Sequence, residues 1–260
     1  KNARLVEENS KETEARANLS RFLSPDVVEQ IVAKKINLSL GGTVRDGTVL
    51  FSDLVSFTSI SEEISPSSLV DLLNVYFDLM ADRIYSMHGS LNKFIGDAIL
   101  AVWGAPFNTH DHPLRALRAA LLMQYALFDL DLSLSKDGNQ WLGMGIGVNS
   151  GSFIAGNVGS RKVMEYTVLG DTVNTCQRLA GLATEGQVLA TKATLEAIPE
   201  GVFLLALAMP VVPLKGKERP VEIFSIRGVA TEGAEEMLVS LPAFVQAPQK
   251  ERILANISGL

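Results

Sequence analysis

Two stretches of the chain repeat apolar residues at the spacing of an α-helix. The first follows Ser65-Pro66, a pair typical of a helix start, and ends before Gly89. Its apolar face is formed by Leu69, Leu72, Leu73, Tyr76, Phe77 and Met80. The second stretch begins at Pro113 and extends to about Leu132. Both are therefore predicted to be helices that bury one face against a core.

Short apolar runs bounded by glycine or polar residues predict β-strands. Leu91–Ile95 and Ala98–Trp103 flank Gly96-Asp97, which indicates a tight hairpin. A second strand pair is expected around Gly151, and Asp171 is expected to cap a helix that extends to Ala180. The predicted strands are Thr48–Phe51, Leu91–Ile95, Ala98–Trp103, Leu142–Ser150, Phe153–Val158, Tyr166–Leu169, Gln187–Thr191 and Val221–Ile226.

The order of these elements predicts an α+β fold, because several strands are joined as hairpins instead of alternating strictly with helices. We expect a mostly antiparallel sheet with flanking helices. Residues 1–42 form a charged, helix-favouring linker or connector from an upstream region, 43–228 the main domain, and 229–260 a loosely packed tail.

Composition narrows the function classes. The chain has 260 residues, 47% of them hydrophobic, which is sufficient for a large core. A net charge of -6 argues against general nucleic-acid binding. Cys176 is the single cysteine, which excludes an intrachain disulfide and favours a reducing, cytoplasmic compartment. No apolar run is long enough to span a bilayer.

Two aspartates stand at the ends of apolar strands, where a carboxylate is costly without compensation. Asp53 follows Thr48–Phe51, and Asp97 lies at the tip of the predicted hairpin. If the strands are neighbours, the carboxylates converge, and a pair of divalent cations would relieve their repulsion. Such a two-metal site suits phosphoryl chemistry. On spacing alone, a helix cap at Asp53 and a turn residue at Asp97 explain the pattern equally well.

A second polar set follows the strand that ends at Leu169. Asn174 and Arg178 are four residues apart and would share a helix face, where an amide and a guanidinium can hold a sugar and an oxyanion. Lys215 lies in a basic turn that could meet phosphates. A solvated polar face is the competing explanation for the helical pair.

In this order, the motifs resemble the class III nucleotidyl cyclases, a family of adenylyl and guanylyl cyclases with a ferredoxin-like, polymerase-palm-like cyclase fold. The matching stretches are FSDLVSFTSISE (51–62), GSLNKFIGDAILAVWG (89–104), GIGVNSG (145–151), YTVLGDTVNTCQRL (166–179) and PLKGKERPVEIF (213–224). The resemblance covers residues 43–228. It is specific because the motifs occur together.

The resemblance implies a role for each matching residue. Asp53 and Asp97 would hold two Mg²⁺ or Mn²⁺ ions per site, and the ribose 3′-hydroxyl of ATP would attack the α-phosphorus to give cyclic AMP and pyrophosphate. Asn174 would orient the ribose, and Arg178 would stabilise the transition state. Lys215 would contact the terminal phosphates.

The base would be recognised by Lys93 and Thr167, the positions that match the family's base-contacting residues. An ammonium only donates hydrogen bonds, so Lys93 suits N1 of adenine, whereas N1 of guanine is itself a donor. The Thr167 hydroxyl can accept from the adenine amino group, although a hydroxyl can also donate. Lys93 therefore favours ATP as the substrate.

In the family, the aspartates and the remaining residues of one active site come from different chains. Because this chain carries both sets, the resemblance implies a homodimer with two composite active sites. One alternative is a catalytically silent dimerisation or nucleotide-sensing module, which normally lacks one of these positions. Others are a guanylyl cyclase, which Lys93 opposes, and a diguanylate cyclase, whose Gly-Gly-Asp/Glu-Glu-Phe turn is not present.

The sequence departs from the family pattern at three positions. Ser56 stands where glycine is usual, and Gly145 stands where some relatives place an arginine that contacts phosphate. Thr167 replaces the aspartate of many members. Some cyclases with threonine there respond to bicarbonate, so bicarbonate is a possible activator.

Overall fold

The computed structural model describes residues 40–55, 57–134, 142–160, 162–211, 214, 220–232 and 238–239. Residues 1–39 of the predicted helical linker, Ser56 and Lys215 lie outside these ranges, whereas Gly41 and Gly42, also assigned to the linker, belong to a strand. The elements are β1 (Gly41–Val55), α3 (Phe57–Glu63), α4 (Pro66–Ser86), β2 (Ser90–Ile95), β3 (Ala98–Trp103), α5 (His112–Leu134), β4 (Gly143–Gly159), β5 (Met164–Leu169), α6 (Asp171–Leu182), β6 (Val188–Thr191), α7 (Lys192–Glu196), β7 (Val202–Ala208), β8 (Ile223–Thr231) and β9 (Leu238–Val239).

The strands of the described ranges form one sheet in the order β2-β3-β1-β4-β6-β8-β7, with β5 paired to β4 and β9 to β8. Every pair is antiparallel except β4–β6, which is parallel. The predicted α+β fold, a mostly antiparallel sheet with flanking helices, is confirmed.

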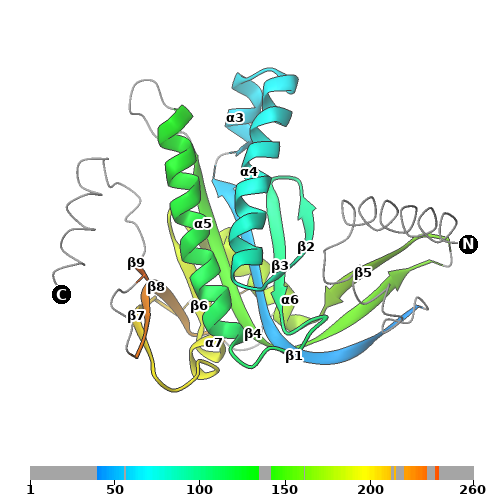
Figure 1. Cartoon of the computed structure of the whole chain (residues 1–260), viewed down its shortest axis with the longest axis vertical. Helices are drawn as coiled ribbons and strands as arrows, with labels where there is room; N and C mark the ends of the chain where they lie inside the picture. The colour runs from blue at the N-terminus through cyan, green and yellow to red at the C-terminus, as the bar shows by residue number, and fades with distance from the viewer. Residues whose placement is uncertain are drawn as a thin grey trace, which may run out of the picture.

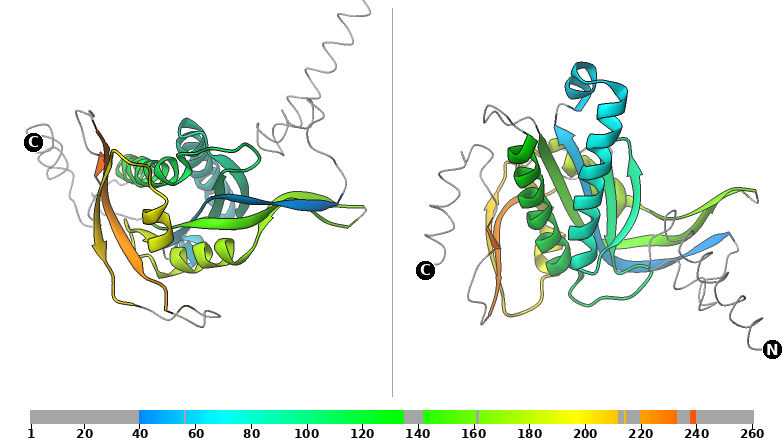
Figure 2. Two further views of the ribbon diagram at one scale, coloured as in Figure 1. Left: turned by 90° about the horizontal axis from the view of Figure 1, so that it is seen from below. Right: turned by 45° about the horizontal axis from the view of Figure 1, so that its top comes forward.

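Helices cover both faces of the sheet (Figures 1 and 2): α4 and α5 lie on one face and α6 on the other. The side chains of β1 alternate between these layers, as the period of a strand requires. Leu50 and Leu54 belong to the core under α4 and α5, whereas Val49 and Phe51 pack with Cys176 of α6. The centre of β1 is therefore buried on both faces, and its C-terminal end emerges at the edge of the core.

Several local predictions are confirmed. Helix α4 begins at Pro66, and the side chain of Ser65 caps it by accepting a hydrogen bond from Ser68 N. Strands β2 and β3 form the hairpin around Gly96-Asp97, with Ile95 opposite Ala98. Helix α5 is two residues longer at its C-terminal end than the approximate boundary expected.

Three predictions are wrong. Gly151 does not separate two strands: β4 is continuous and pairs with β1 along its length, and Gly151 lies opposite Gly47. Asp171 is the first residue of α6 and not its cap, which is Gly170. The expected tail at 229–260 begins within β8, because that strand continues to Thr231 and pairs with β9.

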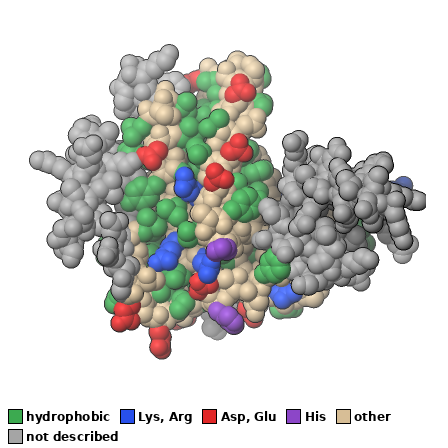
Figure 3. All heavy atoms as spheres, in the orientation of Figure 1, with side chains coloured by type: hydrophobic (Ala, Val, Ile, Leu, Met, Phe, Trp, Pro, Cys, Tyr) green, Lys and Arg blue, Asp and Glu red, His purple; other side chains and the backbone are tan. Residues whose placement is uncertain are grey.

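Figure 3 shows the face that carries α4 and α5, where acidic, basic and apolar side chains are interspersed over the described part of the surface. None of the helices in the described ranges combines the length and the apolar composition that a membrane span requires.

Candidate functional site

The two aspartates predicted to act together are brought together by strand pairing. Strand β1 pairs with β3 so that Ser52 lies opposite Ile99. This register carries Asp53 to the turn that holds Asp97. Asp97 Oδ2 accepts a hydrogen bond from the backbone N–H of Leu54 at 3.1 Å, which fixes the turn against the end of β1.

The environment of Asp53 opposes its ionised form. Partial burial, followed by the negative charge of Asp97 and a hydrogen bond with that carboxyl, raises the pKa of Asp53 to about 6. Two carboxylates held this close repel each other when both are ionised. A divalent cation between them would remove the repulsion, so the pair fits a hard-cation site.

The rest of a cation's coordination would come from groups other than acidic or imidazole side chains. In the described part of the chain, no group of three or more His, Cys, Asp and Glu residues could hold a metal ion. Mg²⁺ commonly uses one or two carboxylates and completes its octahedron with water and substrate phosphates. The Asp53–Asp97 pair matches that preference.

Protons and cations should compete for this pair. Since the pKa of Asp53 is raised to about 6, its protonated fraction grows as the pH falls through that value. We expect the affinity for Mn²⁺ to be nearly constant above pH 7 and to fall about fivefold between pH 6 and pH 5. Titration calorimetry across this range measures the effect. A constant affinity down to pH 5 would contradict the shared site.

Lys93 lies on β2 and Thr167 on β5, and these two strands contact each other. The ammonium of Lys93 forms an ion pair with Glu165 of β5, with Nζ 2.6 Å from Oε2. The Lys93 side chain is 25% exposed, so its remaining N–H donors can still meet a ligand. Glu165 was not expected from the sequence to belong to this group.

A chain of hydrogen bonds fixes the direction of the Thr167 hydroxyl. The Asn92 side-chain amide donates to the Tyr166 carbonyl oxygen at 3.2 Å, and that oxygen can only accept. The amide nitrogen of Asn92 therefore faces Tyr166, and its oxygen Oδ1 faces Thr167. The Thr167 hydroxyl donates to this oxygen at 3.2 Å. Its own oxygen is left as an acceptor toward a ligand.

The remaining predicted residues, Asn174 and Arg178, both lie on α6, as their spacing predicted. Close packing fixes this helix: a side chain at Gly147 of β4 would meet the backbone of Cys176 and Ala180 at 2.5 Å. Asn174 is exposed, and Arg178 is half-buried. Within the described residues, no hydrogen bond or ion pair joins either of them to Asp53 or Asp97.

Close packing against the end of α6 explains why glycine occupies position 145. Gly145 pairs with Asp53 across β1 and β4. A Cβ atom there would lie 2.6 Å from the carbonyl oxygen of Ala183, just after α6. No side chain, and hence no arginine, fits at this position without moving the helix end.

Asn92 and Glu165 contact the predicted site residues, and the sequence analysis did not identify them. Asn92 precedes Lys93 within the hairpin motif, and Glu165 lies two residues before Thr167 on the same strand. Period 2 along β5 places Glu165 and Thr167 on the same face. That spacing could have identified Glu165, whereas the pairing of Asn92 with β5 required the tertiary structure.

Comparisons with known proteins identify the family of the chain. The profile of the family described as "Adenylate and Guanylate cyclase catalytic domain" matches residues 43–228. "Adenylate cyclase 1" of Rhizobium meliloti (strain 1021) is 31% identical over 187 residues, which are 71% of this chain and 28% of that protein. The chain thus spans less than a third of that relative's length.

Two solved structures are similar over most of the described chain. The guanylyl cyclase Cya2 is 38% identical with a TM-score of 0.69, covering 78% of this chain and 100% of that one. The adenylyl cyclase CyaB from P. aeruginosa is 28% identical with a TM-score of 0.68, covering 72% of this chain and 96% of that one. The neighbours therefore include both nucleotide specificities.

Proposed function

The chain belongs to the adenylate and guanylate cyclase catalytic domain family, and on that premise we propose that it converts ATP to 3′,5′-cyclic AMP and pyrophosphate. In this reaction the ribose 3′-hydroxyl attacks the α-phosphorus and pyrophosphate leaves. The choice of ATP is supported by the two base-contacting residues. The choice of reaction is supported by the Asp53–Asp97 pair.

The observation that carries the proposal is the direction of the Thr167 hydroxyl. Because its proton is given to Asn92, its oxygen accepts, and the adenine amino group is a donor. Lys93 would donate to N1 of adenine. Guanine would offer O6 to an oxygen that accepts and N1–H to an ammonium that donates. Both contacts would be mismatched, which favours ATP over GTP.

A guanylyl cyclase is the second candidate, because Cya2 shares 38% identity with this chain. The Glu165 carboxylate next to Lys93 is an acceptor that guanine could use if the ion pair opened. A product assay that offers ATP and GTP separately with Mg²⁺ or Mn²⁺ decides between them. Cyclic AMP as the main product supports the proposal, and cyclic GMP as the main product rejects it.

Asn92→Ala should weaken the preference for ATP. Without the Asn92 oxygen, the Thr167 hydroxyl is free to rotate and can donate to guanine O6. We expect the ratio of kcat/KM for ATP to that for GTP to fall about tenfold, which corresponds to one hydrogen bond gained or lost. Asn108→Ala, which removes an exposed amide after β3, serves as the control. An unchanged ratio in Asn92→Ala would show that Thr167 is not oriented by Asn92.

Glu165→Gln should weaken substrate binding without slowing the chemical step. Glu165 holds the Lys93 ammonium in an ion pair, and in the proposed site Lys93 contacts the base and not the phosphates. Since Glu165 is 54% exposed, the ion pair contributes modestly, and we expect KM for ATP to rise about two- to fivefold with kcat unchanged. Steady-state kinetics separate the two parameters. A loss of kcat alone would assign Glu165 a different role.

The phosphate end of the site is proposed to combine Asp53, Asp97, Asn174, Arg178 and Lys215. Divalent Mg²⁺ or Mn²⁺ held by the aspartates would supply charge stabilisation for the reacting phosphate and lower the pKa of the attacking hydroxyl. Asn174 would orient the ribose. Arg178 would donate to the phosphoryl oxygens as charge develops on them, and Lys215 would bind the terminal phosphates.

We propose that the complete site forms between two copies of the chain. Lys93 pairs with Glu165 and makes no recorded contact with Asp97 in the described structure, although they are four residues apart. The arm formed by β1, β4 and β5 exposes apolar side chains that a second copy could cover: Val44 at 72%, Ile154 at 46%, Val163 at 76% and Met164 at 40%. Val44 lies opposite Ile154 in the β1–β4 pairing, so these two exposed side chains are neighbours and support an interface on the arm.

Bicarbonate activation is part of the proposal, and it rests on Thr167 alone. Thr167 is almost fully buried, at 7% exposure, between Asn92 and the neighbouring strand. The test is the rate of cyclic AMP formation with added bicarbonate at a fixed pH and ionic strength. A rate that does not increase would remove bicarbonate from the proposal.

A further inference from the structure

The outer face of β7 presents three large apolar side chains to solvent. Strand β7 is the last strand of the described sheet and pairs with β8. Val202 and Leu204 point from one face of β7 into the core under α4 and α5. The opposite face carries Phe203, Leu205 and Leu207, which are 59%, 49% and 52% exposed and are called the β7 stripe below. No helix of the described ranges lies on that side of β7 (Figure 2, left).

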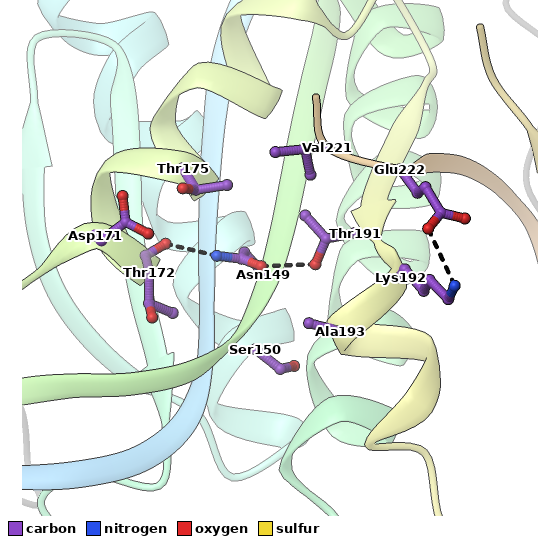
Figure 4. A pocket seen from close by; sticks show the side chains of 10 residues that line it. All are labelled: Asn149, Ser150, Asp171, Thr172, Thr175, Thr191, Lys192, Ala193, Val221 and Glu222. Atoms are coloured by element: carbon purple, nitrogen blue, oxygen red, sulfur yellow. Dashed lines mark hydrogen bonds and ion pairs between the residues drawn. The ribbon is translucent and has the colours of Figure 1, made fainter. Parts of the chain in front are cut away.

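The β7 stripe is one continuous surface. Residues two apart on a strand point to the same face and lie about 7 Å apart, so large side chains at these positions are neighbours. A strand with one face in water normally alternates apolar and polar residues, and β7 does not. The stripe is separate from the cavity between α6 and α7 in Figure 4, because none of the residues lining that cavity belongs to β7. Contiguous exposed apolar side chains mark a surface that another segment or molecule covers.

The chain itself leaves the sheet next to the β7 stripe. Gly228 of β8 pairs with Leu205 of β7 on one side and with Val239 of β9 on the other. Two steps between neighbouring strands place Val239 roughly 10 Å from Leu205. Residues 240–260 follow in the sequence, outside the described ranges. Even as a helix, with a rise of about 1.5 Å per residue, a segment of this length measures about 30 Å and reaches every part of the stripe.

The sequence of 240–260 contains an apolar face of its own. Ile253, Ile257 and Leu260 recur at intervals of four and three residues, which is the spacing of one side of a helix. The large apolar residues of the segment are Leu241, Phe244, Val245, Ile253, Leu254, Ile257 and Leu260. This composition is not typical of a segment that remains in water. We propose that residues 240–260 pack against the β7 stripe of the same chain.

Charge and tethering favour this occupant over a membrane or a second copy. Two exposed acids lie at one end of the stripe: Glu200 just before β7, and Glu232, whose backbone N–H donates to the Gly201 carbonyl at 2.7 Å. They repel an anionic lipid surface. They attract the segment, whose charged residues 250–252 (Lys-Glu-Arg) carry a formal charge of about +1. A tethered segment also meets the stripe at a roughly millimolar effective concentration, well above that of a second copy in micromolar solution.

Thiol reactivity measures whether the β7 stripe is covered. Cys176 is buried, so a cysteine introduced at the surface reacts first. If residues 240–260 are docked for about nine-tenths of the time, Leu205→Cys should react with a maleimide about tenfold more slowly than Val75→Cys, an exposed position on α4. Phe203→Cys should show the same protection and serves as the second probe if Leu205→Cys does not fold. Equal rates at the stripe and on α4 would overturn the proposal.

Substitutions within the segment identify what covers the stripe. Ile253→Asp combined with Ile257→Asp places charges on the apolar face and should raise the reaction rate of Leu205→Cys to that of Val75→Cys. Ser258→Asp adds the same kind of charge away from that face and is the matched control, which should keep the protection. Protection that persists in the double aspartate variant indicates another occupant. Protection that rises with chain concentration from about 1 to about 100 µM indicates a second copy. Either result overturns the proposal.

A cross-link tests the contact directly. A short bifunctional maleimide should join Leu205→Cys to Ile257→Cys within one chain, which mass spectrometry of the digested monomer detects. The pair Val75→Cys and Ile257→Cys is the control and should not be joined. A cross-link that forms only between two chains, or equally in the control pair, contradicts packing of the segment on its own β7 stripe.

Discussion

Replacing Asp97 by asparagine is expected to lower the kcat for cyclic AMP formation by at least about 10³-fold. Asparagine keeps an oxygen that can accept from the Leu54 N–H but removes the charge that a divalent cation requires. A cation at the reacting phosphate contributes several kcal/mol of transition-state stabilisation, and about 4 kcal/mol corresponds to this factor. Asp53→Ala should have an effect of the same size, because both carboxylates are needed.

The fold should survive the Asp97 substitution. In the cation-free chain, Asp97 raises the pKa of Asp53 through its charge, so its removal relieves repulsion. We therefore expect a melting temperature equal to or above that of the unmodified chain. Asp71→Asn, an exposed acid on α4, is the control and should keep full activity. Substantial cyclic AMP production by Asp53→Ala or Asp97→Asn would exclude the two-metal proposal.

Mixing an inactive Asp53→Ala chain with an inactive Arg178→Ala chain is expected to restore activity. If each site takes its aspartates from one copy and its arginine from the other, a mixed dimer contains one site with both defects and one with neither. Random exchange makes half of the dimers mixed, so about a quarter of the original activity should return. Each variant alone should be reduced by about 10²–10³-fold or more.

The mixing experiment has an internal control. Combining Asp53→Ala with Asp97→Asn leaves one defective aspartate in every site, so no intact site can form. Activity that returns in this control would indicate contamination or a monomeric site. Absence of recovery in the first mixture, with chain exchange verified by a tagged copy, would contradict shared sites.

The sequence predicted the central elements well because their patterns are local. Ser65-Pro66 marks the start of α4, and Gly96-Asp97 marks the turn of the β2–β3 hairpin. The continuity of β4 was not predictable in this way, because Gly151 is typical of a turn and only its pairing with Gly47 keeps the strand extended. Strand β7 was missed although all seven residues of its run, Val202–Ala208, are apolar.

In the candidate site, too, the residues in local motifs were predicted and the contacts between distant residues were not. Asp53, Lys93, Thr167, Asn174 and Arg178 were predicted from motifs, and their roles remain predictions. What the sequence did not contain was the orientation of polar groups. A threonine hydroxyl is ambiguous as donor or acceptor until a partner is known, and that partner, Asn92, is 75 residues away along the chain. Glu165 next to Lys93 similarly depends on the position of β5 relative to β2.

Strand β1 joins two distant parts of the molecule without interruption. Its 15 residues, Gly41–Val55, measure roughly 50 Å along the strand, and Asp53 lies two residues before its C-terminal end. Sliding β1 by one residue against β4 would turn Asp53 to the opposite face of the sheet, so the register resists any displacement along the strand. The pairing with β4 therefore fixes the position of Asp53 relative to the arm.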